Sequence, residues 1–200
     1  MTVPTLDDVV AVVVELGTPW ENGRPLWVFG YGSLMYRVDF PIEAKVAGYI
    51  HGRRRAFLQK SHDHRGTALQ PGRVCTLLPT TSESVCWGVA YKVQAGKESE
   101  VKAQLDHREK DGYSIEFISV HSKHGVLHNV MVYVGVCTNP SFAGDSSLED
   151  TAQVIARAEG PSGSNREYLY MLCDTLRGLE GAVIDEYLVE LERLVRAIEQ

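Results

Sequence analysis

The hydrophobic pattern of this chain changes its period about two-thirds of the way along the sequence. Up to residue 137, the apolar residues fall in short runs rich in Val, Ile, Tyr and Phe, bounded by turn-forming residues, as is typical of β-strands. After residue 148 they recur every three or four positions, as on one face of a helix. We therefore expect an α+β fold in which helices pack on a small mixed sheet that is strongly curved or closed into a barrel.

The expected elements follow from this pattern. We expect strands at 26–30, 44–51, 73–78, 84–93, 114–121 and 126–137, and helices at 97–108, 148–158, 165–179 and 183–198. Thr5 and Asp8 resemble a helix start before residues 9–16, although the valines there would also suit a strand. Gly, Pro and Asn gather in 17–25, which predicts an N-terminal extension over 1–25 and one domain over 26–200.

The composition limits the classes of partner. The 200 residues are 44% hydrophobic and 23% charged, which fits a single globular domain large enough to surround a closed pocket. The net charge of −6 argues against a nucleic-acid or membrane-surface partner. A small anionic substrate would have to meet local positive groups, and the main basic cluster is Arg53-Arg54-Arg55. We expect at least two of these arginines to be solvated, because three consecutive side chains on a strand cannot all point inward.

The cysteines and the N-terminus bear on the compartment. The four cysteines, Cys75, Cys86, Cys137 and Cys173, show no C-x-x-C spacing, and their apolar or small neighbours predict buried, reduced thiols. The apolar run at 9–14 has no basic residues before it and is far shorter than a membrane span. We therefore expect a cytoplasmic protein, and we expect it to be monomeric.

The segment Trp27-Val-Phe-Gly-Tyr-Gly-Ser-Leu-Met35 holds the first candidate site. An apolar strand runs directly into a Gly-Tyr-Gly-Ser turn, whose backbone N–H groups could point one way and cradle an anion. Gly30 and Gly32 would let a ligand approach the backbone closely, and Ser33 adds a hydroxyl group. The same residues would also suit an ordinary tight turn between two strands.

Glu109 is the second candidate. It follows a short predicted helix, in a polar run that ends at Gly112, so that the turn could lift its carboxylate over a pocket. From these residues alone, Glu109 could also be one more solvated charge.

The sequence also suggests two other kinds of active site, a metal site and a cysteine nucleophile. His62 and His64 lie two apart, so on a strand both rings would face one side, and with Asp63 or His51 they would suggest a metal hydrolase. No third ligand has a recognisable spacing. A thiol hydrolase would need Cys75 or Cys86 as its nucleophile.

Several blocks of residues, taken together, resemble the ChaC-type γ-glutamylcyclotransferases in order and spacing, over about residues 27 to 197. The blocks are Tyr31-Gly-Ser-Leu34 after Trp-Val-Phe, Asp63-His-Arg-Gly66, Pro71-Gly-Arg-Val74, Trp87-Gly-Val-Ala-Tyr91, Arg108-Glu-Lys110 with Gly112-Tyr113, Gly160-Pro-Ser-Gly163 and Glu167-Tyr-Leu169. Where relatives carry two arginines and then Phe-Trp, this chain reads Arg55-Ala-Phe-Leu58, and Asp111 replaces the first glycine of Gly-Gly-Tyr.

The resemblance implies a glutathione-specific, lyase-type enzyme of the cytosol that releases 5-oxoproline and cysteinylglycine, on the small β-barrel-like fold of γ-glutamylcyclotransferases. It implies no metal or organic cofactor. The loop Tyr31, Gly32, Ser33 and Leu34 would hold the γ-glutamyl group, Glu109 would be the catalytic base, and Tyr168 would line the same pocket. Arg55 and Arg73 could each bind the glycine carboxylate of glutathione or form a structural ion pair. Other γ-glutamyl peptides or amines, and a noncatalytic γ-glutamyl-binding module, stay open as alternatives.

Overall fold

The computed structural model describes residues 23–109 and 112–198. Its larger elements, in chain order, are β1 (Trp27–Gly30), β2 (Ile42–His51), β3 (Arg53–Ser61), β4 (Gly72–Pro79), β5 (Val85–Val93), α1 (Glu98–Arg108), β6 (Tyr113–Ser122), β7 (Gly125–Gly135), α2 (Leu148–Arg157), α3 (Asn165–Arg177) and α4 (Glu186–Ile198). A short 3-10 helix, η3 (Ser33–Met35), follows β1, and two short strands, β8 (Glu159–Gly160) and β9 (Gly163–Ser164), precede α3.

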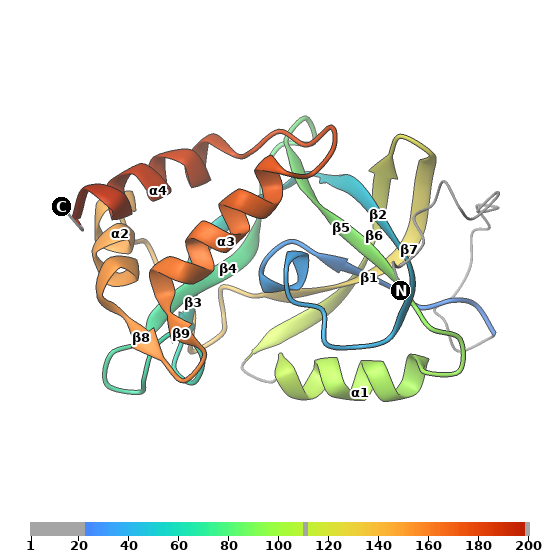
Figure 1. The fold of residues 1–200 in the computed structure, drawn as a ribbon, viewed down its shortest axis with the longest axis horizontal. Helices are drawn as coiled ribbons and strands as arrows, with labels where there is room; N and C mark the ends of the chain where they lie inside the picture. The colour runs from blue at the N-terminus through green and yellow to red at the C-terminus, as the bar shows by residue number, and fades with distance from the viewer. Residues whose placement is uncertain (1–22, 110–111, 199–200) are drawn as a thin grey trace.

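Five strands close into a barrel in the order β1-β5-β2-β6-β7. Four of the strand pairings in it are antiparallel, and β1 closes the ring by pairing in parallel with β7 through Val28 and Met131. All four residues of β1 are buried, because this strand passes through the centre of the molecule (Figure 1). The loop that follows β1 is consequently held inside the protein rather than on its surface.

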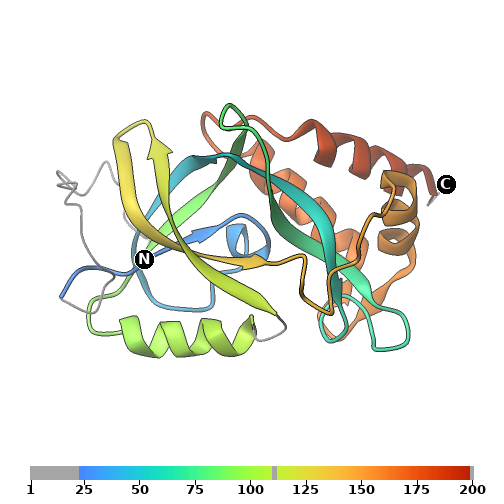
Figure 2. The same cartoon turned by 180° about the vertical axis from the view of Figure 1, so that it is seen from behind.

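A second sheet, β3-β4, extends away from the barrel and carries the C-terminal helices (Figure 1). Figure 2 shows from behind that α2, α3 and α4 gather on the side of β3 and β4, whereas α1 lies apart from them beside the barrel. Serine side chains start two of these helices: Ser147 Oγ accepts from the N–H of Asp150 and Ser164 Oγ from the N–H of Glu167. Residues from both of these parts line a cavity where they meet.

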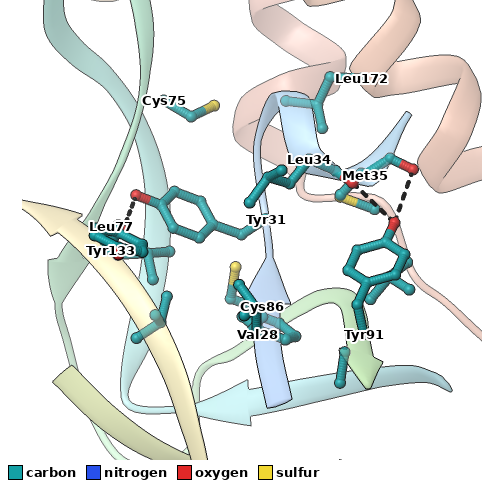
Figure 3. Close-up of a cluster of buried hydrophobic side chains, with 14 of the residues drawn as sticks. Val28, Tyr31, Leu34, Met35, Cys75, Leu77, Cys86, Tyr91, Tyr133 and Leu172 are labelled. Carbon is teal, nitrogen blue, oxygen red and sulfur yellow. Dashed lines mark hydrogen bonds between the residues drawn. The ribbon is translucent and has the colours of Figure 1, made fainter. Parts of the chain in front are cut away.

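One core cluster joins the barrel to the helices. Figure 3 shows Leu34 and Met35 of η3 near Leu172 of α3, and Val28 of β1 near Cys86 in the same cluster, and all of these residues are buried. Removing this apolar surface from water stabilises the fold by about 25 cal/mol per Å². The same contacts fix the turn after β1 between the barrel and α3.

The predicted α+β architecture is confirmed, as are the six predicted strands and the four helices predicted after residue 96. The prediction missed β3, which begins in the Arg53-Arg54-Arg55 run. Of these arginines, Arg54 is exposed, Arg53 is half-buried and paired with Glu116, and Arg55 is buried, so one arginine rather than the expected two is exposed to solvent. The expected helix at 9–16 lies outside the described residues, and the division into 1–25 and 26–200 stays a prediction.

Two further observations concern the cysteines and the membrane. Cys75, Cys86 and Cys173 are buried free thiols, but the prediction was wrong for Cys137, which is exposed just after β7 ends. Among the helices in 23–109 and 112–198, none is long and apolar enough to cross a membrane.

Candidate functional site

A cavity of about 470 Å³ opens between the barrel, α1, the β3-β4 sheet and α3. Its lining includes six of the eight residues predicted for the site: Tyr31, Gly32, Ser33, Leu34, Glu109 and Tyr168. These residues come from three widely separated parts of the chain. Residues 31–34 follow β1, Glu109 ends α1, and Tyr168 lies in the first turn of α3.

The loop after β1 is held by its carbonyl groups. The Nε of Arg55 donates to the carbonyl oxygen of Tyr31 at 2.7 Å, and the hydroxyl of Tyr91 donates to that of Leu34 at 2.8 Å. Figure 3 shows the second contact, together with the hydrogen bond that the Tyr31 hydroxyl donates to the carbonyl oxygen of Tyr133, 2.8 Å long. The donors lie deep in the protein, so the carbonyl edge of the loop is fixed by the fold itself.

The opposite edge of the loop carries amide groups. Within 23–109 and 112–198, the N–H groups of Gly32, Ser33 and Leu34 donate to no other residue, whereas the carbonyl oxygens of Gly32 and Ser33 accept from the N–H groups of the next turn. Amides without partners on a cavity wall suit a carboxylate or an oxyanion, because an unsatisfied buried N–H costs free energy until an acceptor arrives.

Gly32 lies in direct contact with the far wall. A Cβ atom at this position would come within 2.8 Å of the Tyr168 hydroxyl oxygen and 3.5 Å of the Cβ of Cys75. The Tyr168 hydroxyl itself accepts from the N–H of Cys75 at 3.3 Å, and the ring packs edge-on against Phe57. The glycine is therefore required here by the close approach of two walls of the cavity.

Glu109 is the C-cap residue of α1, and its N–H donates to the carbonyl oxygen of Leu105 at 2.9 Å. Its side chain is only 18% exposed. This burial raises the pKa of the carboxyl group above its usual value, the Arg108 guanidinium lowers it, and the carboxylates of Asp39 and Asp63 raise it again. A carboxyl group with a raised pKa on a cavity wall is suited to accept and return a proton.

Arg108 lies between Glu109 and the loop. Its Nη2 donates to Ser33 Oγ at 2.6 Å, its Nε lies 3.4 Å from Glu109 Oε1, and its Nη1 lies 3.4 Å from Asp39 Oδ1. No role was predicted for this arginine from the sequence. Its place in the Arg108-Glu-Lys110 block beside a candidate base was the one signal that could have pointed to it.

The other two predicted arginines lie elsewhere. Neither Arg55 nor Arg73 is among the described residues that line the cavity. Arg55 is buried behind the loop, where it forms an ion pair with Asp185 at 2.5 Å and also donates to the carbonyl oxygen of Trp87. It therefore has the structural role that was one of its two expected roles. Arg73 is half-buried at the start of β4, and its Nε has no hydrogen-bond partner in the described chain.

Other cations face the cavity instead. Arg65 is buried and paired with Glu167 at 2.5 Å, and its guanidinium lies 5.9 Å from the ring centroid of Tyr168. Lys60 and Arg37 also line the cavity, and neither forms an ion pair with a described residue. In the sequence, Arg65 stands out only as part of the Asp63-His-Arg-Gly66 block, because residue spacing does not show how the loop after β3 approaches α3.

The structure gives little support for a cysteine nucleophile or for a metal site. Burial raises the pKa of the Cys86 thiol to about 11 and shifts that of Cys75 upward too, so both favour the thiol form over the nucleophilic thiolate. Of the predicted metal-ligand candidates, Asp63 and His64 line the cavity. In the described ranges, no three His, Cys, Asp or Glu side chains are arranged to hold a metal ion.

Comparisons with known proteins agree on one family. The chain is 37% identical to a fission yeast (Schizosaccharomyces pombe) protein named glutathione-specific gamma-glutamylcyclotransferase, with 86% of this chain and 92% of the relative covered. It is 39% identical to gamma-glutamylcyclotransferase 2-3 of Arabidopsis thaliana (86% and 89% covered) and 35% identical to the human glutathione-specific gamma-glutamylcyclotransferase 1 (86% and 80% covered).

The fold agrees as well. The crystal structure of a yeast gamma-glutamyl cyclotransferase specific to glutathione superposes with a TM-score of 0.81 at 32% identity, covering 86% of this chain and 96% of that one. The model of the family described as ChaC-like protein matches residues 26–198. The chain belongs to the ChaC-like protein family.

Proposed function

We propose that this chain is a cytoplasmic, monomeric γ-glutamylcyclotransferase that converts glutathione to 5-oxoproline and cysteinylglycine. The observation that carries the proposal is the position of the half-buried carboxyl group of Glu109, on the wall of the same cavity as the unpaired amides of Gly32, Ser33 and Leu34. The relatives named above, whose names specify glutathione, support the choice of substrate.

The reaction needs a base because the nucleophile is the substrate's own α-amine. At neutral pH this group is an ammonium ion, which cannot attack a carbonyl carbon until it loses a proton. In our proposal, the Glu109 carboxylate takes that proton, the amine attacks the γ-carbonyl carbon, and the lactam ring closes. The protonated carboxyl group then gives the proton to the nitrogen of the leaving cysteinylglycine as the γ-amide bond breaks.

The loop would hold the γ-glutamyl group in the conformation that closes a ring. The amine and the carbonyl carbon must approach to roughly 3 to 3.5 Å, and holding that conformer supplies several kcal/mol of the barrier. The amides of Gly32, Ser33 and Leu34 could bind either the α-carboxylate or the oxyanion that develops on the γ-carbonyl oxygen. Tyr31 would act through its backbone, because its hydroxyl already donates to the carbonyl oxygen of Tyr133.

The cysteinylglycine half would extend toward the β3-β4 side of the cavity. Because Arg55 and Arg73 do not line the cavity, another cation must meet the glycine carboxylate. Arg65 is already paired with Glu167. Lys60, on β3 and without an ion-pair partner in the described chain, is our candidate for this contact.

Incubation of the purified protein with glutathione and with γ-glutamyl-alanine, followed by an assay of 5-oxoproline, tests the function. We expect release from glutathione in preference. The Glu109→Gln variant keeps the shape of the side chain and removes its basicity, so it should lose at least about a hundredfold in kcat. Near wild-type turnover by the folded variant would exclude Glu109 as the base, and binding of glutathione without turnover would support the noncatalytic alternative.

A further inference from the structure

We propose that Arg108 is a positioning residue that connects the substrate loop to the base: it fixes the carboxylate of Glu109 relative to Ser33 and keeps that carboxylate ionised. The inference rests on the proposed function for its kinetic test. Its geometric basis is the placement of one guanidinium within reach of Ser33 Oγ, Glu109 Oε1 and Asp39 Oδ1 at 2.6, 3.4 and 3.4 Å.

Each of the three nitrogen atoms of the Arg108 guanidinium lies next to a different residue: Nη2 next to Ser33, Nε next to Glu109 and Nη1 next to Asp39. The Arg108 side chain is 20% exposed and extends from the last residue of α1, one position before Glu109. Ser33 is the first residue of η3, on the loop that lines the cavity. A planar, always charged fork can hold two groups at a fixed separation, which a flexible point charge such as lysine does less well. The loop and the base therefore share one rigid connection.

The surroundings of Glu109 show why a cation is needed. The acidic groups that act on its carboxyl group are Asp39, which follows η3, and Asp63, in the loop after β3, and both disfavour its ionisation. The neighbouring phenols of Tyr31 and Tyr133 are uncharged at neutral pH, because burial raises the pKa of each. Among the described residues, Arg108 is the cation that opposes this effect on Glu109.

A base that is protonated before the substrate arrives cannot accept the ammonium proton. The enzyme needs a carboxylate that is ionised in the free state and becomes a strong enough base when the site closes around the substrate. Arg108 supplies the first requirement by stabilising the ionised form. A carboxylate of the substrate at the loop would also compete for the same guanidinium, which would weaken its hold on Glu109 when proton transfer is due.

The pH dependence of kcat/KM for glutathione tests the proposal, because its acid limb reports the pKa of the base in the free enzyme. Arg108→Met removes the charge at similar length, so we expect the acid limb to move to higher pH. Below the limb, kcat/KM should fall by about tenfold for each pH unit of this shift. Arg108→Lys keeps the charge and should restore the limb toward its wild-type position, while the lost contact with Ser33 raises KM.

Two matched variants show whether the shift of the acid limb comes from Arg108 itself. One controls for the loss of any positive charge, and the other for the loss of the contact with the loop. Arg54→Met removes one arginine from the exposed face of β3, away from the cavity, and should leave the limb in place. Ser33→Ala removes only the hydroxyl that Arg108 binds, and should raise KM without moving the limb. An unchanged limb in Arg108→Met, or an equal shift in Arg108→Lys, would overturn the proposal.

A second measurement does not need turnover. Carbon NMR of the chain labelled at the glutamate carboxyl carbon follows the titration of Glu109 directly, with the resonance assigned through Glu109→Gln. The titration should move to higher pH in Arg108→Met and remain near the wild-type position in Arg108→Lys. If the wild-type protein released no 5-oxoproline, the proposed function would fail, while this titration would still decide whether Arg108 holds the carboxylate ionised.

Discussion

Replacement of Gly32 by alanine tests whether the two walls of the cavity touch as the structure has them. The added Cβ would lie 2.8 Å from the hydroxyl oxygen of Tyr168, about 0.7 Å closer than an ordinary contact of roughly 3.5 Å. Tyr168 cannot easily move away, because its ring is buried and packs edge-on against Phe57 and Tyr36. Overpacking of this kind costs about 1–3 kcal/mol of unfolding free energy.

A double-mutant cycle isolates the contact. Tyr168→Phe alone removes the oxygen atom and the 3.3 Å hydrogen bond from the N–H of Cys75, for a cost of about 1 kcal/mol. In the double variant, the methyl group added by Gly32→Ala occupies the space that the oxygen leaves. The two changes should therefore cost less together than separately, with a coupling of roughly 1–2 kcal/mol.

Urea unfolding, followed by circular dichroism, measures each variant, and KM for glutathione reports the cavity. Gly178→Ala is the matched control, because a Cβ there meets its nearest neighbour, the carbonyl oxygen of Asp174, at an ordinary 3.5 Å. Its unfolding free energy should change little. Gly32→Val adds two more methyl groups and should abolish activity. Costs of Gly32→Ala and Tyr168→Phe that add within about 0.5 kcal/mol would refute the contact.

Three further predictions concern other parts of the structure. Glu109→Gln should unfold at higher urea concentration than the wild type at pH 8 but not at pH 4. Folding raises the pKa of the Glu109 carboxyl group, so the wild-type protein loses stability as the pH rises through the folded pKa and the buried carboxyl group ionises, whereas glutamine stays neutral. Asp185→Asn should destabilise the fold by about 3 kcal/mol in the same assay, since it leaves the fully buried Arg55 without its carboxylate; Asp174→Asn, in an exposed pair, should cost under about 1 kcal/mol. Lys60→Met should raise KM for glutathione by about tenfold and leave KM for γ-glutamylcysteine, which lacks the glycine, unchanged.

The fold was largely predictable because most of its elements carry local signals. The strands of the barrel are bounded by turn formers, and α2 and α3 begin at serine caps that are visible in the sequence. The strand β3 was missed because it opens with three arginines and its pairing partner, β4, lies across a polar loop of ten residues, 62–71. Its pairing with β4 is a long-range interaction that the strand's own residues do not encode.

The site was predictable only in part, for a related reason. The resemblance assigned the loop at residues 31–34, Glu109 and Tyr168, and the structure brings all three to one cavity. The burial of Arg55 behind the loop depends on which face of β3 it occupies and on its pairing with Asp185, a carboxylate 130 residues later in the chain. The place of Arg108 depended on how the end of α1 approaches η3. Both are matters of tertiary packing, which residue spacing along the chain does not determine.

The binding capacity of the loop comes from an imbalance in its hydrogen bonds. A turn that satisfied all its own backbone groups would have nothing to offer a ligand. Here the carbonyl oxygens of Tyr31 and Leu34 accept from Arg55 and Tyr91, which are themselves held by the core, while the N–H groups of Gly32, Ser33 and Leu34, residues that line the cavity, have no acceptor in the described chain. Asp185, just before α4, neutralises Arg55. The C-terminal segment thus helps to orient a loop that follows the first strand of the barrel, so the site forms only when the barrel and the helices have both folded.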